Sequence, residues 1–345
     1  MASLDVFNSD AFSAISLTQA VEKVPYLPTM LGDMGIFDSI PVRTTTVFVE
    51  ERAGTISLIQ TDARGAPPKQ RTTELRSARS FNTVRIAQSD TLQAHELQNI
   101  RAFGSETEFM AVQAEFMRRM VGPAGVLRNI ELTWENMRLG AIQGVVTDAD
   151  GSTIYDWFTE FGVSQDTEID FDLDNASPAS GAVRKLCSQV IRQMARAANG
   201  AWVQGRTQIH ALCGDTFWDQ LIAHSEVRQT YLNWTAAADL RGPAAWTEGF
   251  FYGGIYFHNY RGTDDGSTIA VGATKAKFFP VGAPGAFQVA WSPAETFDFV
   301  NTPGQDRYML TVQDRDRNAW VRGEMYSYPL FYCTRPKMLQ RARNT

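Results

Sequence analysis

The stretch "LTWENMRLGAIQGVVTDADGSTIYDWFTEFGV", residues 132–163, changes from a helical to a β pattern within a few positions. Its first half continues an apolar stripe at helical spacing, in which Trp134 and Ala141 lie on one face. Residues 144–158 then fit a hairpin that turns at Asp150-Gly151. A long helix that leads directly into a hairpin predicts a chain of the α+β class, and the flanking segments extend this pattern.

A second apolar stripe precedes this helix and is separated from it by "GPAG", residues 122–125. The second stripe consists of Phe109, Val112, Phe116 and Met120. It follows Ser105 and Glu108, which fit a capping box. Pro123 lacks a backbone donor and disfavours helix in the residue before it. The two stripes together predict a helical rod on the order of 50 Å long, at about 1.5 Å per residue. We expect the rod to bend at a hinge formed by Gly122, Pro123 and Gly125.

Residues 44–90 predict a long hairpin whose tip has almost nothing to bury. Both flanks are rich in Thr, Val, Ile and Phe, whereas the tip sequence "TDARGAPPKQ", residues 61–70, is polar. Between Gln60 and Ala78 the only sizeable aliphatic side chain is Leu75. Because so little apolar surface can hold the tip against its own domain, we expect the tip to rest on another chain.

The charges of the tip favour the same interpretation. Residues 60–79 carry five basic side chains against two acidic ones, whereas residues 1–50 carry six acidic against two basic ones. The basic residues, expected to contact a neighbouring copy, are Arg64, Lys69, Arg71, Arg76 and Arg79. Complementary charge would set the orientation and rate of encounter more than the affinity. The sequence leaves open the alternative of a solvated loop whose charges only keep it soluble.

The middle of the chain mixes strands and helices. Segment 166–175, "DTEIDFDLDN", alternates acidic and apolar side chains and predicts a strand with one acidic face. We interpret that face as solvated or facing another subunit rather than as a cation site. Residues 177–200 predict an amphipathic helix that ends at Asn199-Gly200.

The last third of the chain is predicted to be mainly β. It follows a short helix over 215–227, capped by Asp215 or Thr216. Turn sequences recur through residues 250–336, and the last strand, over 319–336, is predicted to be long and unbroken.

Composition bounds the class of protein. With 345 residues and 44% hydrophobic content, the chain can bury a sizeable core in two domains, or in one with large insertions. The net charge of −6 argues against a dedicated nucleic-acid binder. Only six of the 32 basic residues are Lys; Arg suits ion pairs between surfaces, although codon bias explains the excess equally well. Neither a signal peptide nor a membrane span is expected.

The sequence contains no legible catalytic, metal or cofactor site. No close ligand spacing joins the four histidines, His95, His210, His224 and His258. The three scattered cysteines are interpreted as buried thiols: Cys187, Cys213 and Cys333. "DADG", residues 148–151, fails as a calcium loop because Gly and Glu do not follow at the required positions. We therefore expect a protein that is not an enzyme and needs no cofactor.

Five stretches, in order along the chain, resemble one family. They are residues 132–163, "CGDTFWDQLIAHSEVRQTYLN" (213–233), "FFYGGIYFHNYRG" (250–262), "FFPVGAPGAFQVAWSPAETFDFVNTPG" (278–304) and "LFYCTRPKML" (330–339). Together they are similar to the major capsid proteins of lambda-like tailed phages, the protein E family. Residues before 132 match this family by the order of elements rather than by motif.

The resemblance implies the major capsid fold of tailed phages and herpesviruses, the Hong Kong ninety-seven type. Its parts are an N-terminal arm, an extended hairpin called the E-loop, a long spine helix, a peripheral domain and an axial domain. The expected division is the arm in 1–43, the E-loop in 44–90, the spine and first part of the peripheral domain in 91–176, mainly the axial domain in 177–300, and a return to the peripheral domain in 301–345.

The resemblance also implies a function. The chain would be the shell subunit that assembles as hexamers and pentamers into the icosahedral head around the double-stranded DNA of a tailed phage. Its partners would be copies of itself, a scaffold protein, a portal protein and non-specifically contacted DNA, and whether a decoration protein binds is left open. It would reside in the virion after assembly in the bacterial cytoplasm.

Two features limit what the resemblance implies. The chain shows no long, charged helical segment before its arm, so a separate scaffold protein is expected. Lys69 has neither an Asn partner nor an activating acid identifiable in the sequence, so no subunit cross-link is expected. Two alternatives stay open: a tail-tube subunit, although such subunits are mainly β, and a soluble α+β hydrolase with a scattered site.

Overall fold

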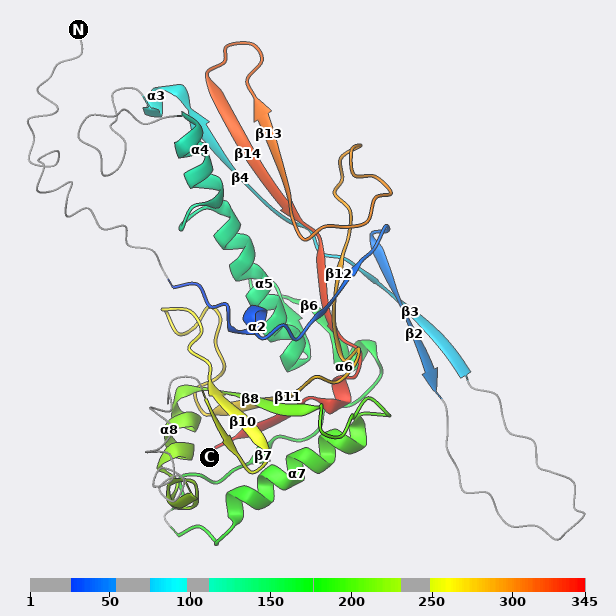
Figure 1. Ribbon diagram of the computed structural model, residues 1–345, viewed down its shortest axis with the longest axis vertical. Coiled ribbons are helices and arrows are strands. Elements are labelled where there is room, and N and C mark those ends of the chain that lie inside the picture. Colours follow the sequence, from blue (N-terminus) through cyan, green and yellow to red (C-terminus); the bar gives the residue numbers. More distant parts are fainter. Residues whose placement is uncertain (1–25, 54–74, 98–111, 176, 231–248, 345) are drawn as a thin grey trace, which may run out of the picture.

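The computed structural model describes residues 26–53, 75–97, 112–175, 177–230 and 249–344. Figure 1 shows an elongated part built on helices and a narrow sheet, a compact part built on a broad sheet, and a hairpin that projects away from both. Buried apolar side chains fill the space along the helices and on both faces of the broad sheet.

Two successive helices form the predicted rod, α4 (Val112–Val121) and α5 (Val126–Gln143). Their apolar stripe is buried, as its spacing predicted, from Met120 to Ala141, but Val112 at the start of α4 is 58% exposed and does not belong to it. The helix stops between them at residues 122–125, where Pro123 had been expected to interrupt it. The expected start of the first helix, at Ser105 and Glu108, lies outside the described residues.

The narrow sheet lies along the rod and fixes both helices. It contains, in spatial order, β13 (Tyr308–Gln313), β14 (Trp320–Ser327) and β4 (Ile86–Gln93), which continues into α3 (Ala94–Leu97). Met120 of α4 packs on Gly323 of β14, where an added Cβ would lie 2.4 Å from the methionine sulfur. In α5, Trp134 donates from its indole nitrogen to Ser327 Oγ at 3.1 Å. The same strands therefore contact the rod on both sides of its interruption.

The prediction of one unbroken strand over 319–336 is wrong, because the chain changes sheets at Tyr328. Ser327 ends β14, and its hydroxyl donates to the Asp306 carbonyl at 2.7 Å. The Tyr328 carbonyl accepts from Ser292 N at 3.0 Å, outside the ladder of β14. A second small sheet then contains three strands, β1 (Asp38–Pro41), β12 (Phe287–Trp291) and β15 (Pro329–Cys333).

The hairpin predicted over residues 144–158 is present in its first part. Its strands are β5 (Val145–Thr147) and β6 (Thr153–Asp156), and Gly151 takes a left-handed φ of 83° at the turn. The chain then forms a single helical turn, α6 (Trp157–Glu160), because the Asp156 carboxylate accepts from Phe158 N at 3.0 Å and caps it. This turn buries Trp157 in the same core as the apolar stripe of the rod.

The broad sheet of the compact part has six strands. In spatial order they are β7 (Ile169–Asp170), β16 (Gln340–Arg343), β11 (Lys275–Val281), β8 (Gln208–Cys213), β10 (Ile255–Asn259) and β9 (Phe250–Tyr252). Residues 301–345 therefore do not stay together, because their last strand lies in this sheet, beside β11. The short helix η3 (Pro336–Met338) leads the chain there.

Helices cover one face of this sheet, and the end of the rod covers the other. On the first face lie α7 (Ala182–Ala197) and α8 (Asp215–Ala223), whose apolar stripes join one core with the sheet. On the second face, Leu212 and Phe279 pack with Leu139 and Ile142 of α5. The compact part is thus attached to the rod through side chains as well as through the chain.

Two sequence predictions in the compact part need correction. The strand expected over 166–175 is only the two residues of β7, because Asp172 adopts a left-handed φ of 47° and turns the chain. The predicted alternation still holds, with Ile169, Phe171 and Leu173 buried. Helix α8 is preceded by Gly214 rather than capped by the side chain of Asp215 or Thr216.

The described part of the N-terminal arm packs on its own chain. Within it, α2 (Met30–Asp33) forms one helical turn whose Leu31 is buried with α5. The carboxylate of Glu135 in α5 accepts from the amides of Leu31, at 2.8 Å, and Gly32, at 3.2 Å. The buried acid thereby satisfies two amides at the start of the turn.

Candidate functional site

The projecting hairpin consists of two antiparallel strands, β2 (Thr46–Ala53) and β3 (Leu75–Asn82). Val47 and Phe81 at its base are buried in the core beside α5 and α6. Phe48 points the other way and is 70% exposed. No third strand pairs with β2 or β3 in the described part of the chain. The base is anchored, and the outer surface presents apolar and polar groups to solvent.

The five basic residues predicted for the loop tip separate in the structure. Arg64, Lys69 and Arg71 lie outside the described residues. Arg76 belongs to β3, opposite Arg52 in the ladder. Arg79 belongs to the anchored base of β3, where its guanidinium donates to the backbone carbonyls of residues 160 and 161. Its position over the Phe161 ring, 5.7 Å from the centroid, is a further contact within its own chain. We therefore assign Arg79 to the base of the hairpin, not its tip.

The interruption of the rod is a tight backbone turn. Gly122 N donates to the Arg118 carbonyl at 2.9 Å, and Gly125 N donates to the Gly122 carbonyl at 2.9 Å. A Cβ on Gly122 would lie 2.2 Å from the Arg118 oxygen, and one on Gly125 would lie 2.8 Å from the Arg119 oxygen. Both glycines are therefore required by close backbone approach, whereas Pro123 accounts for the helix break.

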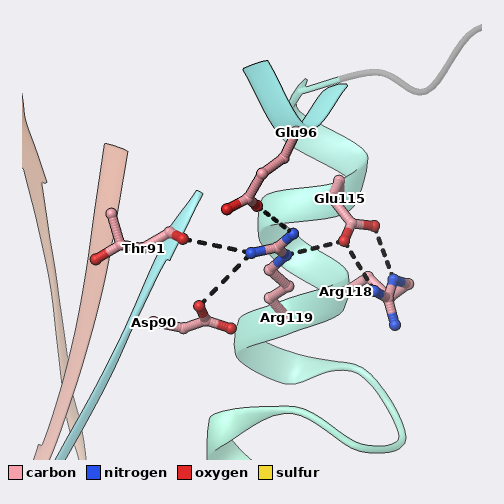
Figure 2. Close-up of polar contacts among 6 residues, drawn as sticks. All are labelled: Asp90, Thr91, Glu96, Glu115, Arg118 and Arg119. Atoms are coloured by element: carbon pink, nitrogen blue, oxygen red, sulfur yellow. Dashed lines mark hydrogen bonds and ion pairs between the residues drawn. The ribbon is translucent and has the colours of Figure 1, made fainter. Parts of the chain in front are cut away.

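Directly before this turn, an ion network fixes α4 to the narrow sheet (Figure 2). Glu115 is only 4% exposed and accepts two hydrogen bonds from Arg118, each at 2.8 Å, and one from Arg119 Nε at 2.9 Å. Arg119 also donates to Glu96 at 2.7 Å and to the Thr91 carbonyl at 3.3 Å. One guanidinium thus connects helix α4 to both β4 and α3.

Hydrogen bonds from Arg118 and Arg119 hold the pKa of the buried Glu115 carboxyl at about 2, well below its ordinary value. Burial alone would raise this pKa, so the two guanidinium groups more than offset the loss of solvation. Sequence reasoning missed the network. The acid and its two bases are spaced i, i+3 and i, i+4, which is a signal for helical ion pairs. Their partners on β4 and α3 could not have been identified without the fold.

A second buried acid, Glu135, lies where the arm, the rod and the compact part meet. Besides the two amides of α2, it contacts Arg138 at 3.2 Å, and Tyr260 of the compact part lies 3.5 Å away. Burial raises the pKa of Glu135, although the amides and Arg138 oppose this effect. Through these contacts Glu135 positions the arm on the rod.

Among the residues that the structure describes, the remaining titratable groups form no recognisable reaction site. His210 and His258, which no sequence spacing connects, become neighbours because β8 and β10 are parallel, and their ring nitrogens lie 2.9 Å apart. Burial raises the pKa of all three thiols, Cys187, Cys213 and Cys333, and this disfavours the reactive thiolate. Among the described residues, no group of three or more acidic, histidine or cysteine side chains could hold a metal ion.

The long helical rod with its narrow sheet, the projecting hairpin and the compact mixed domain define a class of protein, the tailed-phage major capsid fold of the Hong Kong ninety-seven type. Solved capsid structures share this arrangement. That of cyanophage P-SCSP1u matches with a TM-score of 0.52 and 11% identity over 94% of this chain and 90% of its own. That of cyanophage Pam1 matches with a TM-score of 0.52 and 12% identity, over 89% and 88%.

The family model described as phage major capsid protein E matches residues 13–344. The chain belongs to this family. Among related proteins, the major capsid protein of Salmonella phage Felix O1 is 25% identical and covers 95% of each chain. That of Pseudomonas phage KPP10 is also 25% identical, over 88% of this chain and 89% of its own. The family is structural rather than enzymatic, so neither the tail-tube nor the hydrolase alternative is favoured.

No helix in the described ranges combines the length and apolar character needed to cross a bilayer.

Proposed function

We propose that this chain forms hexamers and pentamers that close into an icosahedral shell around packaged double-stranded DNA. Shell formation itself follows from membership of the capsid family; the capsomers and their contacts are the proposal. Three elements would make these contacts: the arm, the E-loop and the rod, which corresponds to the spine helix. The compact part corresponds to the axial domain, and the narrow sheet to the peripheral domain.

The observation that carries the proposal is the projecting hairpin. Its base is anchored by Val47 and Phe81, but Phe48 is exposed and neither edge is paired in the described part of the chain. Isolated two-stranded hairpins are only marginally stable in water, so a long one needs a surface to rest on. A neighbouring subunit supplies that surface, and the basic residues Arg64, Lys69 and Arg71 would favour an acidic one.

Other partners follow from the same assignment. We infer a separate scaffold protein during assembly, a portal protein at one vertex, and assembly in the cytoplasm of the bacterial host. Contact with DNA would be weak and non-specific, because a chain with a net charge of −6 offers little general attraction for phosphate. Whether a decoration protein binds the outer surface is left open.

Deletion of the hairpin tip tests the proposal. In the variant, residues 54–74 are replaced by Asn-Gly, which joins the paired residues Ala53 and Leu75 by a two-residue turn. We expect the isolated subunit to keep its unfolding transition, because the anchored base is untouched. Co-expressed with scaffold, it should form no stable shells by electron microscopy and sizing, whereas the unchanged chain should. Normal shells from the deletion variant would show that the hairpin does not hold the capsomer together.

We further propose that the turn at residues 122–125 lets the rod adapt between capsomer positions. Pro123→Ala would restore a backbone donor and favour continuous helix, so we expect altered particle sizes or more aberrant shells from a folded subunit. Ala124→Ser is the matched control, because it changes the same turn without restoring a donor. Because β4 and β14 contact both helices, any bend must be shared by the narrow sheet. Shells of unchanged size and form from Pro123→Ala would rule out the hinge.

A further inference from the structure

The loop between β12 and β13, residues 292–307, displays a phenylalanine almost completely to solvent. Phe297 is 99% exposed, and Val300, three residues later, is 52% exposed. Between them Phe299 turns inward and packs against Tyr308, with ring centroids 4.7 Å apart. The loop therefore buries Phe299 and exposes Phe297 and Val300.

The loop is held by its own hydrogen bonds and needs no partner to define its path. Phe299 N donates to the Thr296 carbonyl at 3.0 Å, and Thr302 Oγ1 donates to the Phe299 carbonyl at 2.7 Å. At its base, Gly304 N donates to the Val42 carbonyl at 2.8 Å. A pre-formed loop that presents an aromatic anchor loses little conformational entropy when it binds.

The same chain carries a groove suited to such an anchor. A half-open depression of about 1260 Å³ lies between the base of β2, the end of α7 and the turn after β15. Its apolar lining includes Val42, Phe48, Phe161 and Tyr332. Phe297 does not fill the groove of its own chain, because its side chain is in solvent.

Charges on the two surfaces are complementary. Arg43, Arg335 and Lys337 line the groove, against one acid, Glu50. Some of this positive charge is already engaged, because Lys337 lies 3.5 Å from Asp166 and Arg335 donates to the Ala198 carbonyl at 2.7 Å. Arg43, which also lines the groove, is exposed.

The loop carries the opposite charge beside its anchor. Glu295 and Asp298 flank Phe297 and are both exposed. Glu295 also pairs with Arg85 at 3.1 Å, an exposed ion pair of the kind that contributes little to stability. Attraction between the acidic loop of one copy and the basic groove of another would orient the two copies as they approach each other.

We propose that Phe297 of one copy inserts into the β2–α7 groove of a neighbouring copy. The inference rests on the proposed assembly into capsomers and adds a contact between two different surfaces of the same chain. Such a heterologous contact can repeat from copy to copy and close a ring. The Phe297 ring supplies the apolar anchor, and Glu295 and Asp298 face the basic side chains around the groove.

Disulfide trapping between two singly substituted chains tests the contact. Asp298→Cys keeps Phe297 and puts a thiol beside it; Thr44→Cys puts one on the groove wall, at an exposed residue. The native cysteines are buried, so background coupling should be low. In shells co-assembled from both variants under a mild oxidant, we expect a covalent dimer on a denaturing gel. Shells with Asp316→Cys, an exposed acid of the β13–β14 turn, and Thr44→Cys should give none.

Each outcome decides between the contact and its rivals. Well-formed shells without the Asp298→Cys/Thr44→Cys dimer would overturn the inference while leaving assembly intact. A dimer of Thr44→Cys with Lys69→Cys instead would place the E-loop tip in the groove and overturn it as well. Failure of the unchanged chain to form shells with scaffold would instead contradict the proposed function.

Loss of the anchor gives a second, quantitative test. Phe297→Ala should raise the subunit concentration needed for shells by about tenfold or more, since burial of a phenylalanine on binding is lost. Phe297→Leu should recover most of that loss. Phe251→Ala, at another exposed phenylalanine on β9, is the matched control and should change this concentration less than Phe297→Ala. Equal effects at both positions would overturn the specific role of Phe297.

Discussion

In the six-stranded sheet, β16, β11, β8 and β10 are each paired on both sides, and helices α7 and α8 cover one face. In the hairpin of β2 and β3, each strand pairs only with the other in the described chain, and the core covers only the base. The sheet completes its core within one subunit. The hairpin leaves its outer surface for another molecule. The contrast separates residues whose replacement should unfold the subunit from those whose replacement should impair assembly.

The largest effect on folding is expected in the sheet. Phe278 is fully buried, stacked with Phe171 at 5.8 Å and in edge contact with Phe257 at 6.2 Å. Phe278→Ala should lower the free energy of unfolding by about 3–5 kcal/mol. The matched control, Phe48→Ala on the exposed face of β2, should change it by less than about 0.5 kcal/mol. Denaturant unfolding of the isolated subunits measures both changes in free energy. Similar losses for the two variants would contradict the proposed difference between the sheet and the hairpin.

A smaller loss is expected from the ion network that fixes α4. Glu115→Ala removes the shared carboxylate and leaves Arg118 and Arg119 without it, so we expect about 2–3 kcal/mol of destabilisation. This loss is smaller than for a fully buried ion pair, because Arg118 is half-exposed and Arg119 keeps a second partner, Glu96. Glu131→Gln, which breaks the more exposed Arg128 pair at 2.8 Å, should cost under about 0.5 kcal/mol.

The same network predicts a pH dependence with a definite sign. Because the pKa of Glu115 is lowered to about 2 in the folded chain, its ionised form stabilises the fold above its ordinary pKa near 4.5. The advantage of the unchanged chain over Glu115→Gln should be constant above about pH 5 and should shrink as the pH falls toward 2. Parallel unfolding curves at several pH values test this, and an advantage that grows on acidification would contradict it.

The smallest effect on folding is expected at the loop tip. Replacing Arg64, Lys69 and Arg71 together by Glu should leave the unfolding transition unchanged. Assembly with scaffold should be slower and weaker, and the difference from the unchanged chain should narrow at high salt, where exposed charges are screened. Light scattering during assembly at two salt concentrations measures this. A defect that does not respond to salt would indicate a steric rather than an electrostatic cause.

Sequence patterns predicted the local elements well where burial follows a simple period. The stripe through Trp134 and Ala141, the turn at Gly151 and the stop at Asn199-Gly200, just after α7 ends at Ala197, are all local properties of the chain. The interruption at Pro123 is local as well, since a missing backbone donor acts on its own helix. Family resemblance then supplied the arrangement of these parts.

The sequence did not reveal which distant strands and side chains pair with one another. At Tyr328 the chain leaves one sheet for another. Pro329, which lacks a backbone donor, signals an interruption of the strand, but the bond between the Tyr328 carbonyl and Ser292 N could not be predicted from the sequence. His210 and His258 meet only through the register of β8 on β10. Arg79 was assigned to the loop tip by its charge, whereas hydrogen bonds to residues 160 and 161 fix it at the base. Each case depends on a partner far away in the sequence.

The position of β16 has a consequence for the order of events during synthesis. This strand comprises residues 340–343 yet lies between β7 and β11, and the next residue, Asn344, accepts a hydrogen bond from Leu173 N at 2.6 Å. At roughly 5–20 residues per second, the ribosome adds these residues several seconds after β11. Until they emerge, one edge of β11 has no strand beside it, and β7 has none to pair with. A nascent chain therefore cannot complete its sheet before these residues emerge, and we expect a subunit to enter a growing shell only after that.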